Sequence, residues 1–386
     1  MVITGLEVFL AGIDTYKNKR MALIVNQTAV TGTCRYLWEE MRRLGVPPVR
    51  IFSPEHGIFG TEQDQAPVGG QTVQGIDVVS LYGSSRDTLV PDERCLEDID
   101  CVVFDIQDVG SRYYTYVNTM ALSMKAMSGR GIEFIVLDRP NPLGGEEAEG
   151  PSLEDGYGSF VGVFPVPVRH GLTAGELALL YRDMENLDLN ITVVMMSGWE
   201  RGMYYEDTGI PWIPPSPNMP TVTTALVYPG MCLLEGTNVS EGRGTTIPFE
   251  CSGAPFAEVG ALAAMLNGMV LPGVYFRPVE FKPTFNKYHD TTVPGVYLHV
   301  TDRKSFRPFL TGVAVTKAYH DLGGDSFSFL HDVYEFNSQH PAFDLLAGGA
   351  AIRKAIAGRK GLWALRELWA EDEMLFMKRK KEYHIY

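Results

Sequence analysis

Three apolar, strand-like runs of the sequence end in segments rich in polar side chains. These segments are Ser53-Pro-Glu-His-Gly57, Asp105-Ile-Gln-Asp-Val-Gly-Ser-Arg-Tyr-Tyr-Thr-Tyr116 and Asp138-Arg-Pro-Asn-Pro-Leu-Gly-Gly145. In an open parallel sheet, ligands bind beyond the carboxyl ends of the strands. The three segments are therefore expected to meet at one edge of a sheet and to carry the chemistry of the protein.

Glu55 is the first catalytic candidate. Pro54 and the His56-Gly57 pair flank it, so its carboxyl group is expected to be held rigidly and to act as a proton donor. The alternative is a Glu that caps a helix or pairs with an Arg. His56 is a second candidate, which either takes part in the chemistry or only orients Glu55.

Asp105, Gln107 and Asp108 follow within four residues of one another. In an extended strand end, Asp105 and Gln107 share a face. We expect the two acids to be catalytic and Gln107 to bind substrate. Carboxylates at a strand end also commonly accept hydrogen bonds from loop backbones, which is the structural alternative.

The residues that follow suit a sugar ligand. Arg112, Tyr114 and Tyr116 combine a charged donor with aromatic rings on which a sugar can stack and hydroxyl groups that can donate. Some of these aromatic residues must instead belong to the core.

Further polar candidates lie along the rest of the first half. Arg139 and Asn141 stand in a turn stiffened by prolines, Glu149 adds a carboxylate, and His170 precedes the next helix. We expect Arg139, Asn141 and His170 to bind substrate, although Asn-Pro also begins turns for local reasons. Thr173 and Glu176 form a capping box and are interpreted as structural.

A glycine-rich segment at 235–246 contains the candidates Asn238, Glu241 and Arg243. Such a segment can approach a ligand closely, and the Arg243 guanidinium can bind a carboxylate or phosphate through two hydrogen bonds. The phosphate-loop pattern GxxxxGK[ST], GxGxxG after the first strand, HExxH and GxSxG are all absent. Nucleotide-binding, zinc-protease and serine-hydrolase functions are thus not supported.

The composition and charge of the chain exclude several further classes of function. The 386 residues include 33 Lys and Arg against 47 Asp and Glu, a formal net charge of −14, which disfavours nucleic acid and anionic membranes as partners. The five cysteines are an odd number and have no zinc-type spacing, so they indicate neither a full set of disulfides nor a zinc site. No run reaches the roughly 18 apolar residues of a membrane span. Without a visible signal peptide the sequence predicts a cytoplasmic protein as given, or an exported one if a leader has been trimmed.

The elements that must position these side chains follow from hydrophobic patterning. Continuous apolar runs at 21–26, 49–53, 78–82, 101–106, 134–138 and 191–196 predict strands buried on both faces. Helix-period segments at 33–44, 118–129 and 173–185 lie between several of them. The alternation predicts a Rossmann-like, mostly parallel sheet flanked by helices.

The pattern changes near residue 199. Four prolines within 212–220 exclude a helix interior or a central strand there. We expect a helix at 255–268, strands at 273–282 and 295–301, and helices near 305–321 and 361–380. The predicted organisation is a Rossmann-like catalytic domain at 1–215 and a smaller α+β domain at 216–386 that completes the active-site cleft.

The motifs at 53–57, 105–116, 137–145, 149–151 and 235–245, taken in this order, resemble the exo-β-N-acetylmuramidases called NamZ and the bacterial YbbC-like proteins. The resemblance covers nearly the whole chain. It implies a cofactor-free glycosidase that removes N-acetylmuramic acid from the non-reducing end of peptidoglycan fragments, as in bacterial cell-wall recycling. It also implies a catalytic Glu at position 55.

A glycosidase commonly needs a second carboxyl group, unless the 2-acetamido group of the substrate acts as nucleophile. Asp105, Asp108 and Glu149 are the candidates for that second acid. Two other functions remain open at this point. One is metal-assisted hydrolysis with Glu55, His56, Asp105 and Asp108 as ligands, and the other is non-catalytic binding of cell-wall fragments.

Overall fold

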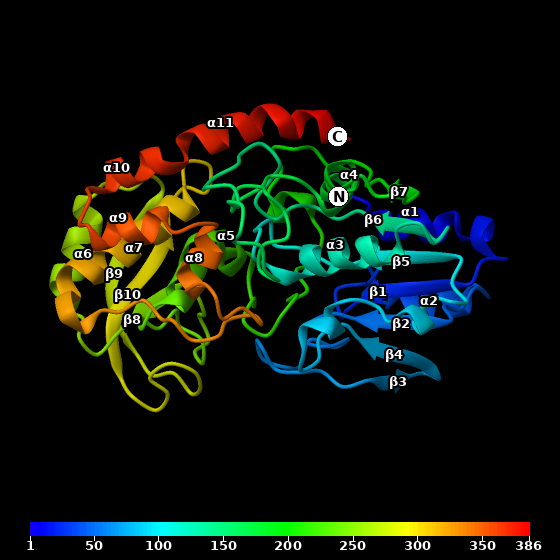
Figure 1. The fold of residues 1–386 in the computed structure, drawn as a ribbon, viewed down its shortest axis with the longest axis horizontal. Helices are drawn as coiled ribbons and strands as arrows, with labels where there is room; N and C mark the ends of the chain where they lie inside the picture. The colour runs from blue at the N-terminus through cyan, green and yellow to red at the C-terminus, as the bar shows by residue number, and fades with distance from the viewer.

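The computed structural model describes residues 1–386 and contains two β-sheets, which lie in the two halves of the chain (Figure 1). The larger sheet has the order β3-β4-β2-β1-β5-β6-β7. All neighbouring strands in it are parallel except β3 and β4. Its strands are β1 (Met21–Val25), β2 (Arg50–Ser53), β3 (Gln71–Val73), β4 (Ile76–Ser80), β5 (Cys101–Asp105), β6 (Glu133–Leu137) and β7 (Ile191–Val194). The predicted parallel sheet is confirmed.

Each of the six apolar runs forms a strand of this sheet, because both sheet faces are covered. Every residue of β1 and β5 is buried. Leu23 of β1 pairs with Ile51 of β2 on one side and with Val103 of β5 on the other. The edge strand β3 is short and largely exposed, so it has no apolar run from which it could be predicted.

Helices cover the two faces separately. On one face, α1 (Gly5–Ala11) and α2 (Leu37–Arg43) pack on a cluster that includes Leu23 and Val103. On the other face, α3 (Thr115–Met127) and α4 (Ala174–Glu185) pack on a cluster that includes Ile24 and Phe104. The alternation of neighbouring strand residues between the two clusters follows from the two-residue period of a strand. The predicted helices at 33–44, 118–129 and 173–185 are thereby confirmed.

The second half contains a three-stranded antiparallel sheet with the order β8-β10-β9 and the remaining helices. Its strands are β8 (Cys251–Gly253), β9 (Val274–Phe281) and β10 (Val293–Val300). Its helices are α5 (Val222–Met231), α6 (Val259–Gly268), α7 (Pro308–Gly323), α8 (Ala342–Ala347), α9 (Ala351–Ala357), α10 (Leu362–Arg366) and α11 (Ala370–Arg379). The smaller α+β unit is thus confirmed. None of the helices has the length and apolar character that a membrane crossing requires.

The two halves share one hydrophobic core, since a single buried cluster runs from β5 and α3 through α5 and α7 to α11. Helices α5 and α7 approach closely: a Cβ atom on Gly230 would lie 1.9 Å from the carbonyl oxygen of Pro308. Helix α11 runs from the second half back towards the first (Figure 1), and Tyr386 beyond it donates a hydrogen bond to Asp138. The two halves are therefore joined by the shared core and by the C-terminal residues that return to the first half.

The proline-rich segment at 212–220 contains no helix or strand and crosses the carboxyl edge of the large sheet. The carbonyl oxygen of Pro215 accepts hydrogen bonds from Gln27, which follows β1, and from Tyr116 of α3. These contacts fix the segment against the sheet edge where the three polar segments end.

Candidate active site

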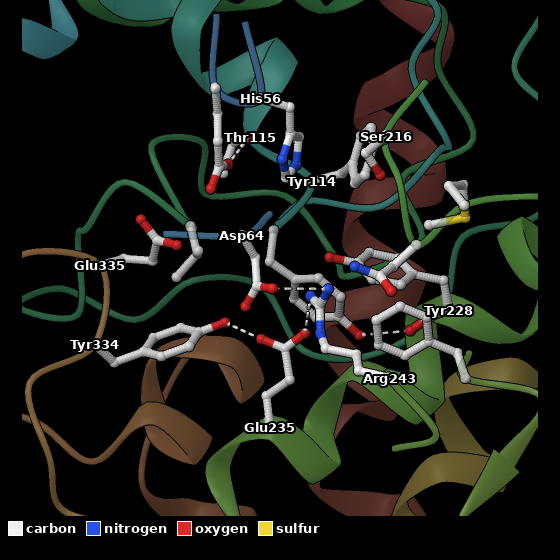
Figure 2. A pocket seen from close by; sticks show the side chains of 16 residues that line it. His56, Asp64, Tyr114, Thr115, Ser216, Tyr228, Glu235, Arg243, Tyr334 and Glu335 are labelled. Carbon is white, nitrogen blue, oxygen red and sulfur yellow. Dashed lines mark hydrogen bonds and ion pairs between the residues drawn. The ribbon is translucent and has the colours of Figure 1, made fainter. Parts of the chain in front are cut away.

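A pocket lies between the two halves of the chain (Figure 2). Its first-half walls include the loop after β2 and the start of α3, and the proline-rich crossing between the halves adds Ser216, Asn218 and Met219. Its second-half walls are α5, the glycine-rich segment and the turn at 334–337. The pocket lies where ligands are expected in an open parallel sheet, beyond the carboxyl ends of the strands.

Glu55 lines this pocket and is 3% exposed. Its Oε2 atom accepts a hydrogen bond from the Thr115 hydroxyl at 2.7 Å, and its Oε1 atom accepts one from the backbone N–H of Gln65 at 3.1 Å. The next residue, His56, has a left-handed φ of 68° and its Nδ1 atom lies 2.8 Å from the carbonyl oxygen of Glu62. The loop thus holds both side chains in defined orientations, as the flanking residues indicated.

Arg243 also lines the pocket and is surrounded by acidic groups (Figure 2). Its Nη2 atom lies 2.7 Å from Glu235, its Nη1 atom 3.2 Å from Asp64 and its Nε atom 3.5 Å from Glu241. The guanidinium lies 5.0 Å from the ring centroid of Phe249. Burial alone would lower the pKa of Arg243, but the neighbouring carboxylates outweigh burial and hold this pKa well above its usual value. Arg243 is therefore a permanent, oriented cation in the pocket.

A fourth carboxyl group of the pocket, Glu335, was not predicted from sequence. Its Oε2 atom accepts a hydrogen bond from the Tyr82 hydroxyl at 2.9 Å. Burial, reinforced by the charge of Glu55, raises the pKa of Glu335 well above its usual value. The neighbouring Tyr334 hydroxyl donates to Glu235 at 2.5 Å. No motif marks this part of the sequence, and its residues become site residues only through the packing of the halves.

Aromatic residues complete the walls. Tyr114 lines the pocket as predicted and meets Tyr228 of α5 edge to face, with ring centroids 5.6 Å apart. Tyr228 in turn meets Phe249 at 4.9 Å. Ser216 and Asn218 of the proline-rich crossing add polar groups that sequence reasoning did not select.

Other predicted residues lie at the same sheet edge but outside this pocket. Asp105 and Arg139 form a buried ion pair with Nε–Oδ1 and Nη2–Oδ2 distances of 2.5 and 2.9 Å. Gln107 donates to the carbonyl oxygens of Asp108 and Pro140, and it lines a smaller hollow together with Arg139. These side chains are engaged with the protein itself, and their predicted roles in the reaction stay predictions.

Two further predicted acids, Asp108 and Glu149, accept hydrogen bonds from backbone N–H groups, and their predicted roles in the reaction also stay predictions. Asp108 accepts from the N–H of Gly110 at 2.6 Å and lies 3.5 Å from Nε2 of His170. Glu149 accepts from the N–H of Leu310 in the first turn of α7, and burial raises the pKa of Glu149 to about 7.

Four more candidates outside the pocket bond to main-chain or acidic partners. Arg112 donates to three carbonyl oxygens, and Asn141 and Asn238 each both donate to and accept from main-chain groups. Glu241 pairs with Lys287 at 2.9 Å. Of the predicted site residues, the structure brings only Glu55, His56, Tyr114 and Arg243 together in the main pocket.

No group of three or more His, Cys, Asp or Glu side chains has an arrangement that could hold a metal ion. The predicted ligand set for metal-assisted hydrolysis is dispersed: Asp105 pairs with Arg139, whereas Glu55 bonds to Thr115. The arrangement does not favour that alternative.

Fold and pocket together define an α/β protein with an acidic, tyrosine-lined site, whose residue types suit a sugar and acid–base chemistry. Models of the N-terminal and C-terminal parts of exo-β-N-acetylmuramidase NamZ match residues 21–223 and 226–386. The chain therefore belongs to the NamZ family and is a glycoside hydrolase.

Individual relatives agree with this assignment. The chain is 43% identical to the peptidoglycan β-N-acetylmuramidase NamZ of Bacillus subtilis strain 168 over 392 residues, covering 100% of this chain and 91% of that protein. Two crystal structures of DUF1343 family proteins from Bacteroides fragilis each cover 100% of this chain and 99% of theirs. Their TM-scores are 0.90 and 0.78, at 36% and 31% identity.

Proposed function

We propose that this protein is an exo-β-N-acetylmuramidase that releases N-acetylmuramic acid from the non-reducing end of peptidoglycan fragments, with Glu55 as general acid. The observation that carries the proposal is the position of Glu55, a buried carboxyl group held by Thr115 and Gln65 at the wall of the pocket between the two halves. Family membership supports the sugar and the bond that is cleaved.

The chemistry requires a proton at the glycosidic oxygen. Glu55 donates it, the bond between the anomeric carbon and that oxygen breaks, and a water molecule later supplies the hydroxyl group of the released sugar and returns a proton to Glu55. The hydrogen bonds from Thr115 and Gln65 fix the carboxyl group in one orientation, so that this transfer needs no rearrangement of the side chain.

The walls of the pocket suit one terminal sugar. Tyr114 and Tyr228 offer aromatic surface for the ring, and Arg243 offers a cation for the lactyl carboxylate that distinguishes N-acetylmuramic acid from N-acetylglucosamine. The proline-rich crossing and the glycine-rich segment approach the sheet edge from the second half, and we infer that they close one end of the site. A closed end favours removal of terminal sugars over cleavage within a chain.

Two assays test the proposal. In the first, the purified protein is given a chromogenic N-acetylmuramic acid β-glycoside beside its N-acetylglucosamine analogue, and only the former should be cleaved efficiently. In the second, a defined glycan with muramic acid at its non-reducing end is followed over time. Early release of the monosaccharide alone supports exo action, whereas early internal fragments contradict it.

A further inference from the structure

Four carboxyl groups line the pocket, but only two of them have a cationic partner. Asp64 and Glu235 pair with Arg243. Glu55 and Glu335 form no ion pair with any Lys, Arg or His of the structure, although they are only 3% and 8% exposed. Buried carboxyl groups without a cation are costly to ionise. A pair of them in one pocket therefore needs a reason beyond stability.

A tight turn of the backbone places the Glu335 side chain at the pocket. Tyr334 and Asn337 exchange backbone hydrogen bonds of 3.0 and 2.9 Å, which leaves Glu335 and Phe336 as the two central residues of a tight turn. Their φ angles are 45° and 62°, a left-handed conformation that Asn-Gly adopts with the least strain. The turn thus carries a charged and an aromatic residue where sterics favour small ones.

Tyr82 explains what holds this turn in place. The Phe336 ring lies 5.7 Å from the Tyr82 ring, and the Tyr82 hydroxyl donates to Glu335 at 2.9 Å. These two contacts compensate for the strained backbone, and they direct the Glu335 carboxyl group into the pocket rather than into solvent.

The same tyrosine links Glu335 to Glu55. Ser53 of β2 and Ser80 of β4 are register partners, and Glu55 and Tyr82 each follow their serine by two residues. Burial together with the charges of Glu55 and Glu335 raises the pKa of Tyr82 above its usual range. One phenol, itself un-ionised, therefore stands beside both unpaired carboxyl groups.

Glu55 and Glu335 line the same pocket, and in such a pair the charge of one carboxyl group opposes ionisation of the other. Burial and the Glu55 charge accordingly raise the pKa of Glu335 well above that of an exposed Glu. The charged and titratable groups that act on Glu335 or share its pocket are Glu55, Asp64, Tyr82, Glu235, His56, Arg243, Tyr113, Tyr114, Tyr228 and Tyr334. Acidic groups dominate this set, so the surroundings favour retention of a proton.

We propose that Glu335 is a positioning residue of the hydrolysis, which shares one proton with Glu55 and keeps that proton in the pocket at neutral pH. This inference rests on the proposed function and adds the second carboxyl group to it. The shared proton passes from the pair, through Glu55, to the glycosidic oxygen as the carbon–oxygen bond breaks. Water adds its oxygen to the anomeric carbon and returns one proton to the pair, which restores the starting state.

The test is the pH dependence of kcat/KM for Glu335→Gln on a muramic acid glycoside with a poor leaving group. Glutamine keeps the shape of the side chain but carries no charge, so Glu55 no longer has a neighbour that helps to retain the proton. We expect the alkaline limb of the profile to move to lower pH by about one unit or more, with about tenfold lower activity at neutral pH and recovery on acidification. An unmoved alkaline limb overturns the proposal.

Two further variants keep the test decisive. Tyr82→Phe removes a hydrogen bond that favours the ionised form of Glu335, so its alkaline limb should move to higher pH, and it tests the proposal even where Glu335→Gln fails to fold. An unmoved limb in Tyr82→Phe overturns the proposal as well. Glu250→Gln is the matched control, since Glu250 is a buried acceptor for Thr224 and Tyr297 outside the pocket. Its profile should equal that of the wild type.

The outcomes also separate this inference from the proposed function. A wild-type protein that releases no muramic acid overturns both. A wild-type protein that is active, together with an inactive Glu55→Gln and a Glu335→Gln whose alkaline limb is unmoved, overturns only the role of Glu335.

Discussion

Arg243 and Glu235 form the central ion pair of the pocket, with 2.7 Å between Nη2 and Oε1. The second oxygen of Glu235 accepts from Tyr334, so the pair ties the glycine-rich segment to the turn that carries Glu335. The Arg243 side chain is only 8% exposed, and its orientation is set before any substrate arrives. In the role proposed above, as the group that binds the lactyl carboxylate, Arg243 would need little reorganisation on binding.

The first prediction concerns the selectivity that this cation provides. Arg243→Ala leaves Asp64, Glu235 and Glu241 without their shared partner, and these carboxylates would repel the lactyl group of the substrate. We expect the kcat/KM ratio of the N-acetylmuramic acid glycoside over the N-acetylglucosamine glycoside to fall about tenfold or more. Arg243→Lys keeps the positive charge but cannot form two parallel hydrogen bonds to a carboxylate. Its kcat/KM ratio should lie between those of the wild type and Arg243→Ala. An unchanged ratio in Arg243→Ala would show that Arg243 does not recognise the lactyl carboxylate.

The second prediction concerns Glu55 as proton donor. Glu55→Gln retains an oxygen that can accept from Thr115, so the fold should be kept, while turnover falls about 100-fold or more. The measurement is kcat on a glycoside with a poor leaving group, because a good leaving group departs without protonation. Turnover close to that of the wild type on this substrate would remove Glu55 from the role of general acid.

The third prediction concerns the buried pair of Asp105 and Arg139. Arg139→Met leaves the Asp105 carboxylate buried and unpaired, and it should lower the free energy of unfolding by about 3–5 kcal/mol. Urea unfolding measures this change. Arg35→Met, which breaks the more exposed pair with Glu40, is the comparison and should cost about 1 kcal/mol or less. Equal effects of the two variants would refute the structural importance of the buried pair.

The fourth prediction concerns pH and Glu149. Its pKa is raised by burial to about 7 in the folded protein, so between the unfolded value near 4.5 and about 7 the folded state binds more protons than the unfolded state. Stability must then fall as pH rises through this window, by about 3 kcal/mol at most. Glu149→Gln lacks this dependence and should gain stability relative to the wild type between pH of about 5 and 7. Parallel stability curves for the two proteins would contradict the buried position of the carboxyl group.

The sequence alone predicts those parts of the structure that depend on local pattern. Strands buried on both faces require continuous apolar runs, and β1, β2, β4, β5, β6 and β7 follow from them. Glu55 is predicted as a site residue because it lies just after a strand, and Arg243 because it lies in a glycine-rich segment. For Glu55 the preceding strand predicts a place at the sheet edge, whereas Arg243 reaches the same pocket only through the packing of the two halves.

The composition of the pocket was decided by tertiary structure. Tyr82 and Glu335 are 253 residues apart and meet only because the turn at 334–337 packs against the loop after β4. The converse holds for Asp105 and Arg139: both follow strands, yet they pair with each other away from the main pocket. Local pattern shows that a carboxylate lies near the sheet edge, but the desolvation that controls its proton and the partner that neutralises its charge depend on groups brought in from distant parts of the chain.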